Sequence, residues 1–264
     1  MRLFTVDAFT DAPFCGNPAG VCILEQELSD EDYLKIAQEV NLSETAFVVP
    51  KGETFRLRWF TPTNEVDLCG HATLATAKIL FDKLQVPNKV LEFETKSGIL
   101  KVEKKDTVLE MNFPLGHLEF VHEPDVLLEK FLNEKPLSIN VDKDWCVLEL
   151  ADEDHVKTFK PDFDLLLSHH KKIVVITAKS EHEHYDFVSR VFGPAIGIDE
   201  DPVTGSAHCY LASFWAKKLN KSTLVGYQAS TRGGVVHCEI VDNQRVLLRG
   251  DCVIMSEMLI DWTF

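Results

Sequence analysis

The chain has 264 residues, 45% of them hydrophobic and 26% charged, which is the composition of an ordinary folded globular protein. Its formal net charge of -15 repels phosphate backbones and anionic lipids, so we expect neither a nucleic-acid partner nor a membrane surface. The seven cysteines are odd in number and scattered, which predicts reduced thiols and a cytoplasmic location. We find no secretory signal at residues 1–6 and no apolar run of membrane-spanning length.

In chain order, the first elements are a strand-like start, a turn-rich segment and an amphipathic helix. Residues 29–40 predict that helix, because Ser29 can cap it and the three acidic residues that follow favour its positive end. Residues 46–49 read as a buried strand, and residues 55–60 alternate as a half-buried strand does. The start of the chain is therefore expected to mix strands with a helix.

Two later segments, residues 70–81 and 205–216, are predicted helices that are apolar nearly all round. A helix without a polar face must be buried on most sides. A further buried strand is expected at 173–178. Small residues gather at the start of both apolar helices, where something must approach closely.

The spacing around these helices indicates an internal duplication. Gly70 to Gly98 spans 28 positions (98 − 70), and Gly205 to Gly233 spans the same number (233 − 205). Similar helix-turn-strand units at a period near 135 predict an α+β fold of two pseudo-symmetric halves, each a curved mixed sheet wrapped around a central buried helix. We place the halves at 1–118, with its helix near 70–82, and 119–264, with its helix near 205–219. The last strand is a candidate to cross back to the first half.

The two glycines that open these helices, Gly70 and Gly205, suggest an anion site. A helix N-terminus presents free backbone N–H groups and a partial positive charge, and glycine lets a ligand reach them. Two such ends facing each other would suit a small carboxylate, each adding about 0.3–2 kcal/mol through its dipole. The alternative is that these residues only cap buried helices.

Five other residues are candidates for chemistry. Glu44 enters an apolar strand, where burial raises the pKa of a carboxyl toward the value that a proton shuttle needs; the alternative is a surface glutamate. His71 lies in the first helical turn, which favours neutral imidazole, or it is a satisfied core histidine. Asp201 and Ser206 can bind a substrate group, or else cap and pack. Cys69 is either a thiol acid/base or a small buried residue.

Cofactor signatures are absent from the sequence. The glycine-rich stretches match neither GxGxxG nor GxxxxGK[ST], and there is no CxxC or HExxH. We therefore expect no cofactor and no metal.

Four stretches and a fifth short motif resemble the phenazine-biosynthesis-like (PhzF-like) isomerase family. They are Asp7–Thr10 with Gly16–Val21, Leu42–Phe47, Asp67–Thr73, Glu200–Ala207, and Arg232-Gly233-Gly234. The resemblance spans nearly the whole chain in family order.

This resemblance implies a diaminopimelate epimerase-like fold, a biosynthetic role, a small carboxylic acid as substrate and a homodimer. By the same resemblance Glu44 moves the proton, His71 and Asp201 assist it, and five residues bind substrate. Those five are Asn17, Cys69, Gly70, Gly205 and Ser206.

Two alternatives to a Glu44 isomerase stay open. Related epimerases and racemases use one cysteine at each helix start. This chain has Cys69 at the first start, but no cysteine between Asp199 and Ala207 at the second. A thiol-assisted epimerase using Cys69 is one alternative, and a non-enzymatic interaction protein on the same fold is the other.

Overall fold

The chain divides into two compact units. The computed structural model describes residues 1–123, 126–169 and 172–261. The first unit comprises Met1–Asn112 together with the described residues from Arg249 onward, and the second comprises Phe113–Leu248. The sequence placed the division after residue 118 and left open whether the last strand returns; here the division follows Asn112, and the last strand belongs to the first unit.

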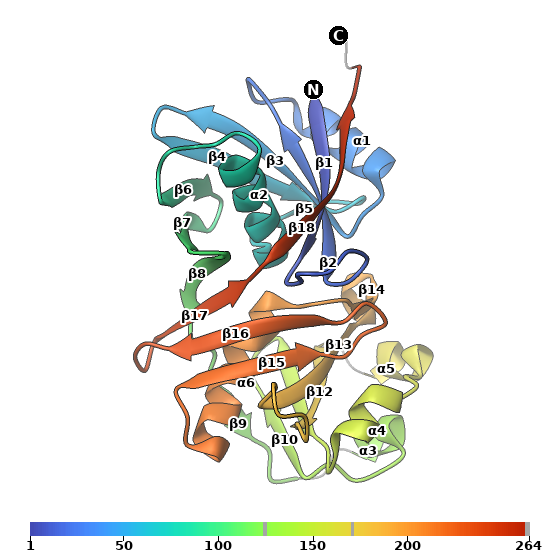
Figure 1. Ribbon diagram of the computed structural model, residues 1–264. Helices are drawn as coiled ribbons and strands as arrows, with labels where there is room; N and C mark the ends of the chain where they lie inside the picture. The colour runs from blue at the N-terminus through green and yellow to red at the C-terminus, as the bar shows by residue number, and fades with distance from the viewer. Residues whose placement is uncertain (124–125, 170–171, 262–264) are drawn as a thin grey trace. The chain divides into compact units, whose positions relative to one another are not determined.

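The first unit is one mixed sheet with two helices (Figure 1). Its strands pair in the order β18-β1-β2-β3-β4-β6-β7-β8, with β5 added beside β4. The pairs β2–β3 and β4–β6 are parallel, and the others are antiparallel. The helices are α1 (Asp30–Val40) and α2 (Gly70–Asp82). The strands are β1 (Arg2–Ala8), β2 (Asn17–Ile23), β3 (Glu44–Lys51), β4 (Thr54–Phe60), β5 (Glu65–Val66), β6 (Val90–Thr95), β7 (Gly98–Lys105), β8 (Val108–Pro114) and β18 (Cys252–Leu259).

The second unit repeats this arrangement. Its strands pair in the order β9-β10-β11-β12-β13-β15-β16, with β14 beside β13, and the pairs β11–β12 and β13–β15 are parallel. The strands are β9 (Glu119–Phe120), β10 (Ser138–Val141), β11 (Trp145–Glu149), β12 (Ile173–Lys179), β13 (Phe187–Gly193), β14 (Ile198–Asp201), β15 (Thr223–Gln228), β16 (Gly234–Ile240) and β17 (Arg245–Gly250). The helices are α3 (Val126–Leu132), α4 (Glu153–Thr158), α5 (Phe163–His169), α6 (Gly205–Leu219) and the short 3₁₀ helix η1 (Pro194–Ile196).

The duplication extends to single residues. Gly98 and Gly233, which the spacing paired, both lie at the turns of equivalent hairpins and both have positive φ, +97° and +67°. This is the backbone region that glycine enters without strain. The matching pairing orders and turns confirm the internal repeat.

The central helix of the first unit is buried as its apolar composition predicts. Helix α2 packs against β1, β2, β3 and β18, and ten of its residues are buried. Helix α1 begins where predicted, because the Ser29 side chain accepts a hydrogen bond from the Asp32 N–H. Its stripe of Tyr33, Ile36 and Ala37 is buried. Burial of these apolar faces is the main stabilising contribution.

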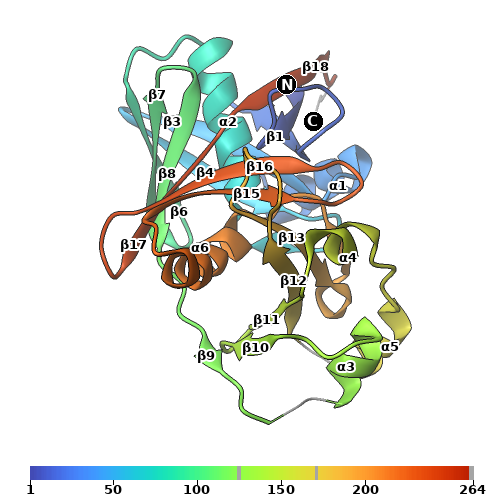
Figure 2. The same cartoon turned by 60° about the horizontal axis from the view of Figure 1, so that its bottom comes forward.

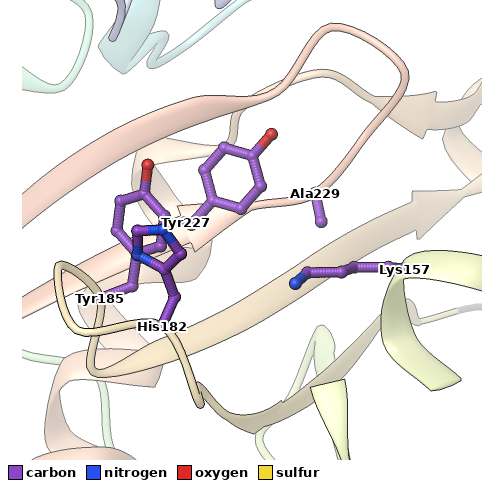
Figure 3. Close-up of a pocket in the computed structure, with 5 residues that line it drawn as sticks. All are labelled: Lys157, His182, Tyr185, Tyr227 and Ala229. Carbon is purple, nitrogen blue, oxygen red and sulfur yellow. The ribbon is translucent and has the colours of Figure 1, made fainter. Parts of the chain in front are cut away.

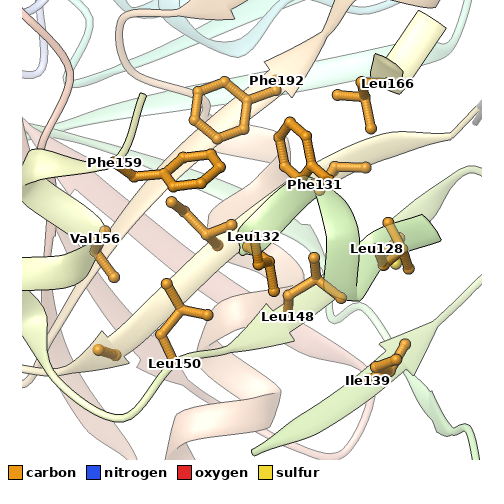
Figure 4. Packing of buried hydrophobic residues seen from close by; sticks show 14 of the residues in the cluster. Leu128, Phe131, Leu132, Ile139, Leu148, Leu150, Val156, Phe159, Leu166 and Phe192 are labelled. Carbon is orange, nitrogen blue, oxygen red and sulfur yellow. The ribbon is translucent and has the colours of Figure 1, made fainter. Parts of the chain in front are cut away.

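In the second unit, α6 packs against β15 and β16 (Figure 2). A separate core lies under the short helices α3, α4 and α5 (Figure 4). There Phe131, Phe159 and Phe192 form a cluster of rings with centroids 5.0–6.2 Å apart. Offset and edge-to-face aromatic contacts of this kind stabilise a core beyond simple burial.

All seven cysteines lie within the described residues and outside any disulfide, and six of them are buried. Within the described residues, no helix has both the length and the hydropathy that crossing a bilayer requires.

Candidate active site

A tight hairpin between β1 and β2 positions Asn17. The buried Asp7 carboxylate accepts a hydrogen bond of 3.0 Å from the Phe14 N–H, which folds the loop back on β1. Gly16 then turns the chain with φ +67°. Asn17, the next residue, pairs with Ala8 and is fully buried. Its amide nitrogen lies 3.4 Å from Nδ1 of His71.

Glu44 is the first residue of β3 and lies in parallel register with Ala19 of β2. The side chain is only 12% exposed. Burial raises the pKa of its carboxyl, and the neighbouring Ser43 side chain opposes part of that shift. The carboxyl is thus better able to hold a proton near neutral pH than an exposed glutamate, as the sequence indicated.

The start of α2 supplies the other two functional groups. Cys69 is the N-cap residue, but its side chain makes no capping hydrogen bond. Its carbonyl instead accepts a 2.6 Å bond from the Thr73 hydroxyl, which fixes the first turn. His71 follows Gly70 and is 7% exposed. No acidic side chain lies in this first turn, so its positive end is left uncompensated by the helix itself.

These side chains meet in the first unit. His71 Nε2 lies 3.4 Å from Glu44 Oε2, and Cys69 Sγ lies 3.5 Å from His71 Nδ1. With Asn17 and Gly70, this cluster contains five of the eight residues that the sequence singled out. A carboxyl, an imidazole and a thiol in contact can pass a proton among them.

The other three predicted residues belong to the second unit, where Asp201 is part of a second cluster and Gly205 and Ser206 open α6. Asp201 Oδ2 accepts a 2.5 Å hydrogen bond from the Thr204 hydroxyl. Gln228 clamps the same turn, since its amide donates to the Asp201 carbonyl at 2.7 Å and accepts from the Thr204 N–H at 2.9 Å. Gly205 is buried, whereas Ser206 is exposed in the first turn of α6.

Both central helices begin without a side-chain cap. Cys69 and Thr204 occupy the N-cap positions of α2 and α6, and neither side chain makes a capping hydrogen bond. Helices α1 and α4, by contrast, are capped by Ser29 and Asp152. Uncapped N–H groups at a helix start are the donors that an anion would use.

Sequence reasoning missed Thr204 and Gln228 as parts of the second cluster. Thr204 lies inside the quoted motif between Asp201 and Ser206, so its position was a usable signal. Gln228 ends β15 and is fully buried. No local pattern marks it, because its contacts are made 24 and 27 residues away in the chain.

A separate cavity of about 410 Å³ opens in the second unit (Figure 3). It is lined by Lys157, His182, Tyr185, Tyr227 and Ala229. Tyr185 stacks on Tyr227 with ring centroids 5.0 Å apart and on His182 at the same separation. None of the predicted site residues lines it, and we assign it no role in the reaction.

Comparison with known proteins identifies the family. The family model described as phenazine biosynthesis-like protein matches residues 6–258. The chain belongs to the phenazine biosynthesis-like family. An uncharacterized isomerase of Pseudomonas aeruginosa is 45% identical over 256 residues, covering 97% of both chains. The crystal structure of an Enterococcus faecalis protein of the PhzF family is 42% identical, with a TM-score of 0.92 over 97% of both chains.

The fold of this family is that of the epimerases. A predicted epimerase from Pseudomonas aeruginosa superposes with a TM-score of 0.74 over 99% of both chains at 17% identity. The expected diaminopimelate epimerase-like α+β fold is therefore confirmed. Relatives that this chain matches over nearly their whole length are named isomerases. The chain is therefore an enzyme of the isomerase class.

Proposed function

We propose that this phenazine biosynthesis-like protein moves a proton at carbon of a small carboxylic acid, cyclic or amino, with Glu44 as the acid/base and without a cofactor. The observation that supports this is the buried Glu44 carboxyl in contact with His71, with its pKa raised by burial. A base whose pKa lies closer to neutral both accepts and returns a proton efficiently.

The chemistry is a two-step proton transfer. The Glu44 carboxylate takes a proton from a carbon acid, and the electron pair left on that carbon delocalises into the conjugated substrate. Protonated Glu44 then returns the proton to a different carbon, so atoms and charge balance without an external reagent. Nε2 of His71 contacts the Glu44 carboxyl, and the Asn17 amide contacts Nδ1 of the same imidazole ring.

The remaining residues are proposed to bind or assist. Gly70 and Cys69 open α2, and Gly205 and Ser206 open α6, both at helix starts that no side chain caps. Backbone N–H groups there suit a substrate carboxylate. We assign Asp201 to orienting a polar substrate group, since Thr204 holds one of its oxygens.

Deuterium uptake tests the proposal. A panel of small cyclic and amino carboxylic acids in D₂O, followed by NMR, should show carbon-bound exchange with wild type. Glu44→Gln should lower the rate by about 10²–10⁴-fold, the usual contribution of a general acid/base. Glu53→Gln, in the exposed turn between β3 and β4, is the matched control and should exchange at the wild-type rate. Undiminished exchange in Glu44→Gln would contradict the proposed role of Glu44.

The contact between Cys69 and His71 keeps a thiol-assisted epimerase as the second candidate. An adjacent imidazole favours the thiolate form, which is the reactive one. Loss of activity in Cys69→Ala together with tolerance of Glu44→Gln would favour this mechanism. The family assignment supports an enzyme of either kind over a non-catalytic interaction protein.

We also propose a cytoplasmic homodimer with no nucleic-acid or membrane partner. The net charge of -15 and the free thiols support the location and the absence of anionic partners. The dimer rests on family resemblance. Light scattering coupled to gel filtration should give twice the chain mass of 29.9 kDa.

A further inference from the structure

Three different metal-ligating groups converge at the Glu44 site. The Glu44 carboxylate, the Cys69 thiol and the His71 imidazole each offer one ligand atom, and these atoms all lie within 4.8 Å of one another. His71 Nε2 is 3.4 Å from Glu44 Oε2 and 4.0 Å from Cys69 Sγ. A tetrahedral zinc ion with bonds of about 2.0–2.3 Å holds its ligand atoms roughly 3.3–3.8 Å apart. One ion on Nε2 therefore requires the Cys69 side chain to turn away from Nδ1, which lies 3.5 Å from its sulfur, toward the Nε2 side of the ring.

The surroundings suit such an ion. The three side chains are nearly buried, so little water competes with them for the metal. Asn17 lies against Nδ1 of His71 at 3.4 Å, and an amide can turn its oxygen toward the Nδ1–H. A hydrogen bond to the second ring nitrogen fixes the orientation of a ligating histidine, which leaves Nε2 for the metal. Three protein ligands also leave the fourth zinc position open.

Cys69 is set apart from most other thiols of the chain by this environment. An imidazole lies 3.5 Å from its sulfur.

We propose that Glu44, Cys69 and His71 form an inhibitory zinc site, in which Zn²⁺ binds the carboxylate, the thiolate and Nε2. The thiol proton, and the carboxyl proton where present, pass to solvent as the metal binds, and no oxidation state changes. Metal binding stands on the ligand geometry alone. The inhibition rests on the proposed function, because bound zinc occupies the carboxylate that the proton transfer needs.

Cobalt titration tests the binding without any substrate. The full chain, stripped with a chelator, is titrated with Co²⁺ and then with Zn²⁺. We expect one Co²⁺ per chain, intense visible bands of a tetrahedral ion, a near-ultraviolet sulfur-to-cobalt band, and displacement of all of these by Zn²⁺. Cys69→Ser, which changes the side chain by a single atom, should remove the sulfur band. Glu44→Gln should weaken the affinity at least about tenfold, since the loss of even an outer-shell partner of a ligand has an effect of that size.

Two controls separate this site from casual metal binding. Cys15→Ser removes the half-exposed thiol, and the double change His182→Ala with His184→Ala removes the neighbouring histidines of an acidic, exposed segment. Both should bind Co²⁺ as wild type does. Absence of stoichiometric binding, survival of the sulfur band in Cys69→Ser, or loss of binding in the histidine variant would overturn the site.

Inhibition by zinc is measured separately, by its effect on deuterium exchange. Micromolar Zn²⁺ should stop deuterium exchange by wild type, and a chelator should restore it. Full exchange at a zinc concentration that saturates the cobalt-competition signal contradicts the inhibition. If instead Glu44→Gln retains full exchange, the proposed function fails while the spectroscopic result still decides the metal site.

Discussion

At the scale of single residues, Gly16 shows how a position without a side chain allows the tight turn that places the next residue, Asn17. Gly16 has φ +67°, and a Cβ there would lie 2.2 Å from the Ala8 carbonyl oxygen and 2.7 Å from Thr10 Cγ2. Gly52, in the turn between β3 and β4, has nearly the same φ, +64°, with nothing within 4 Å. An alanine would therefore be held in the left-handed conformation at both positions, but its Cβ would clash with neighbouring atoms only at position 16.

This difference gives a matched pair of variants. Gly52→Ala should lower the free energy of unfolding by about 1–2 kcal/mol, the cost of a left-handed conformation for a residue with a Cβ. Gly16→Ala should cost distinctly more, because backbone atoms must move, and it should also lower activity by shifting Asn17 from His71. Urea unfolding measures both stabilities; equal losses at the two sites would contradict the clash.

His208 gives a pH-dependent contribution to stability. It is completely buried in α6, its Nδ1 lies 2.8 Å from the Thr204 carbonyl, and its Nε2 has no hydrogen-bond partner. Nδ1 therefore carries the proton and donates it to the carbonyl, and the ring is neutral. Burial lowers its pKa from the usual 6.5 to about 4. The unfolded chain thus binds one more proton than the folded chain between these values.

Stability should fall as the pH drops from 6.5 toward 4, by about 3 kcal/mol from this group. Between pH 7 and 4.5, carboxyls whose pKa is lowered by their partners, such as Glu65 and Asp82, still make most of their contribution, whereas Glu44, whose pKa burial raises, changes stability in the opposite direction. The His208 contribution is therefore the difference between wild type and a His208 variant over this range. Unfolding free energies over that range should vary less with pH in His208→Gln. His184→Gln, at an exposed histidine, should leave the wild-type slope unchanged. An unchanged slope in His208→Gln would refute the assignment.

At the scale of elements, the repeat preserves one ion pair in each unit. Arg58 on β4 binds both carboxylate oxygens of Glu65 on β5, each at 2.7 Å. Arg190 on β13 binds Glu200 on β14 in the same way, at 2.7 and 2.8 Å. Both arginines also lie over a phenylalanine ring, of Phe60 and Phe192. Each pair ties down the turn that leads into a central helix start.

Arg190→Met should therefore be strongly destabilising. The change leaves the Glu200 carboxylate, 17% exposed, without its partner, and also removes the donor to the Phe159 carbonyl at 2.5 Å. Breaking a buried pair from one side costs about 3–5 kcal/mol. Arg2→Met is the control, because its pair with Glu257 is 38% exposed on both sides and is worth at most about 1 kcal/mol. Chemical denaturation should separate the two variants; similar losses would contradict this account.

Elements whose apolar residues recur at a regular spacing could be predicted from the sequence. Contacts between segments far apart in the chain could not. The stripe of α1, the apolar α2 and α6 and the alternating β4 follow from local patterns that burial enforces. Glu44 could be singled out because a carboxylate in an apolar strand is unusual. The clamp of Gln228 on Thr204 could not, since nothing near Gln228 records a partner 24 residues away.

At the scale of the whole molecule, the two repeats exchange their flanking strands along the chain. Strand β9 follows the strands of the first unit and pairs with β10 of the second. Strand β18 follows those of the second unit and pairs along the full length of β1 in the first. The first and last strands of the chain thus lie side by side in the first unit. Met1 and Ile260 form two backbone hydrogen bonds with each other, of 2.9 and 3.1 Å. Sequence periodicity detects the repeat but not this exchange.

The first unit should therefore need the end of the chain in order to fold. A chain that stops at Asp251 lacks β18, which leaves β1 as an unpaired edge and uncovers part of α2. We expect the amides of α2 to lose hydrogen-exchange protection, whereas those of α6 in the second unit keep theirs. A chain that stops at Asp261 retains all of β18 and is the control. Addition of a separate peptide spanning residues 252–261 should restore protection to α2. Wild-type protection in the shorter chain without the peptide would show that β18 is dispensable for the first unit.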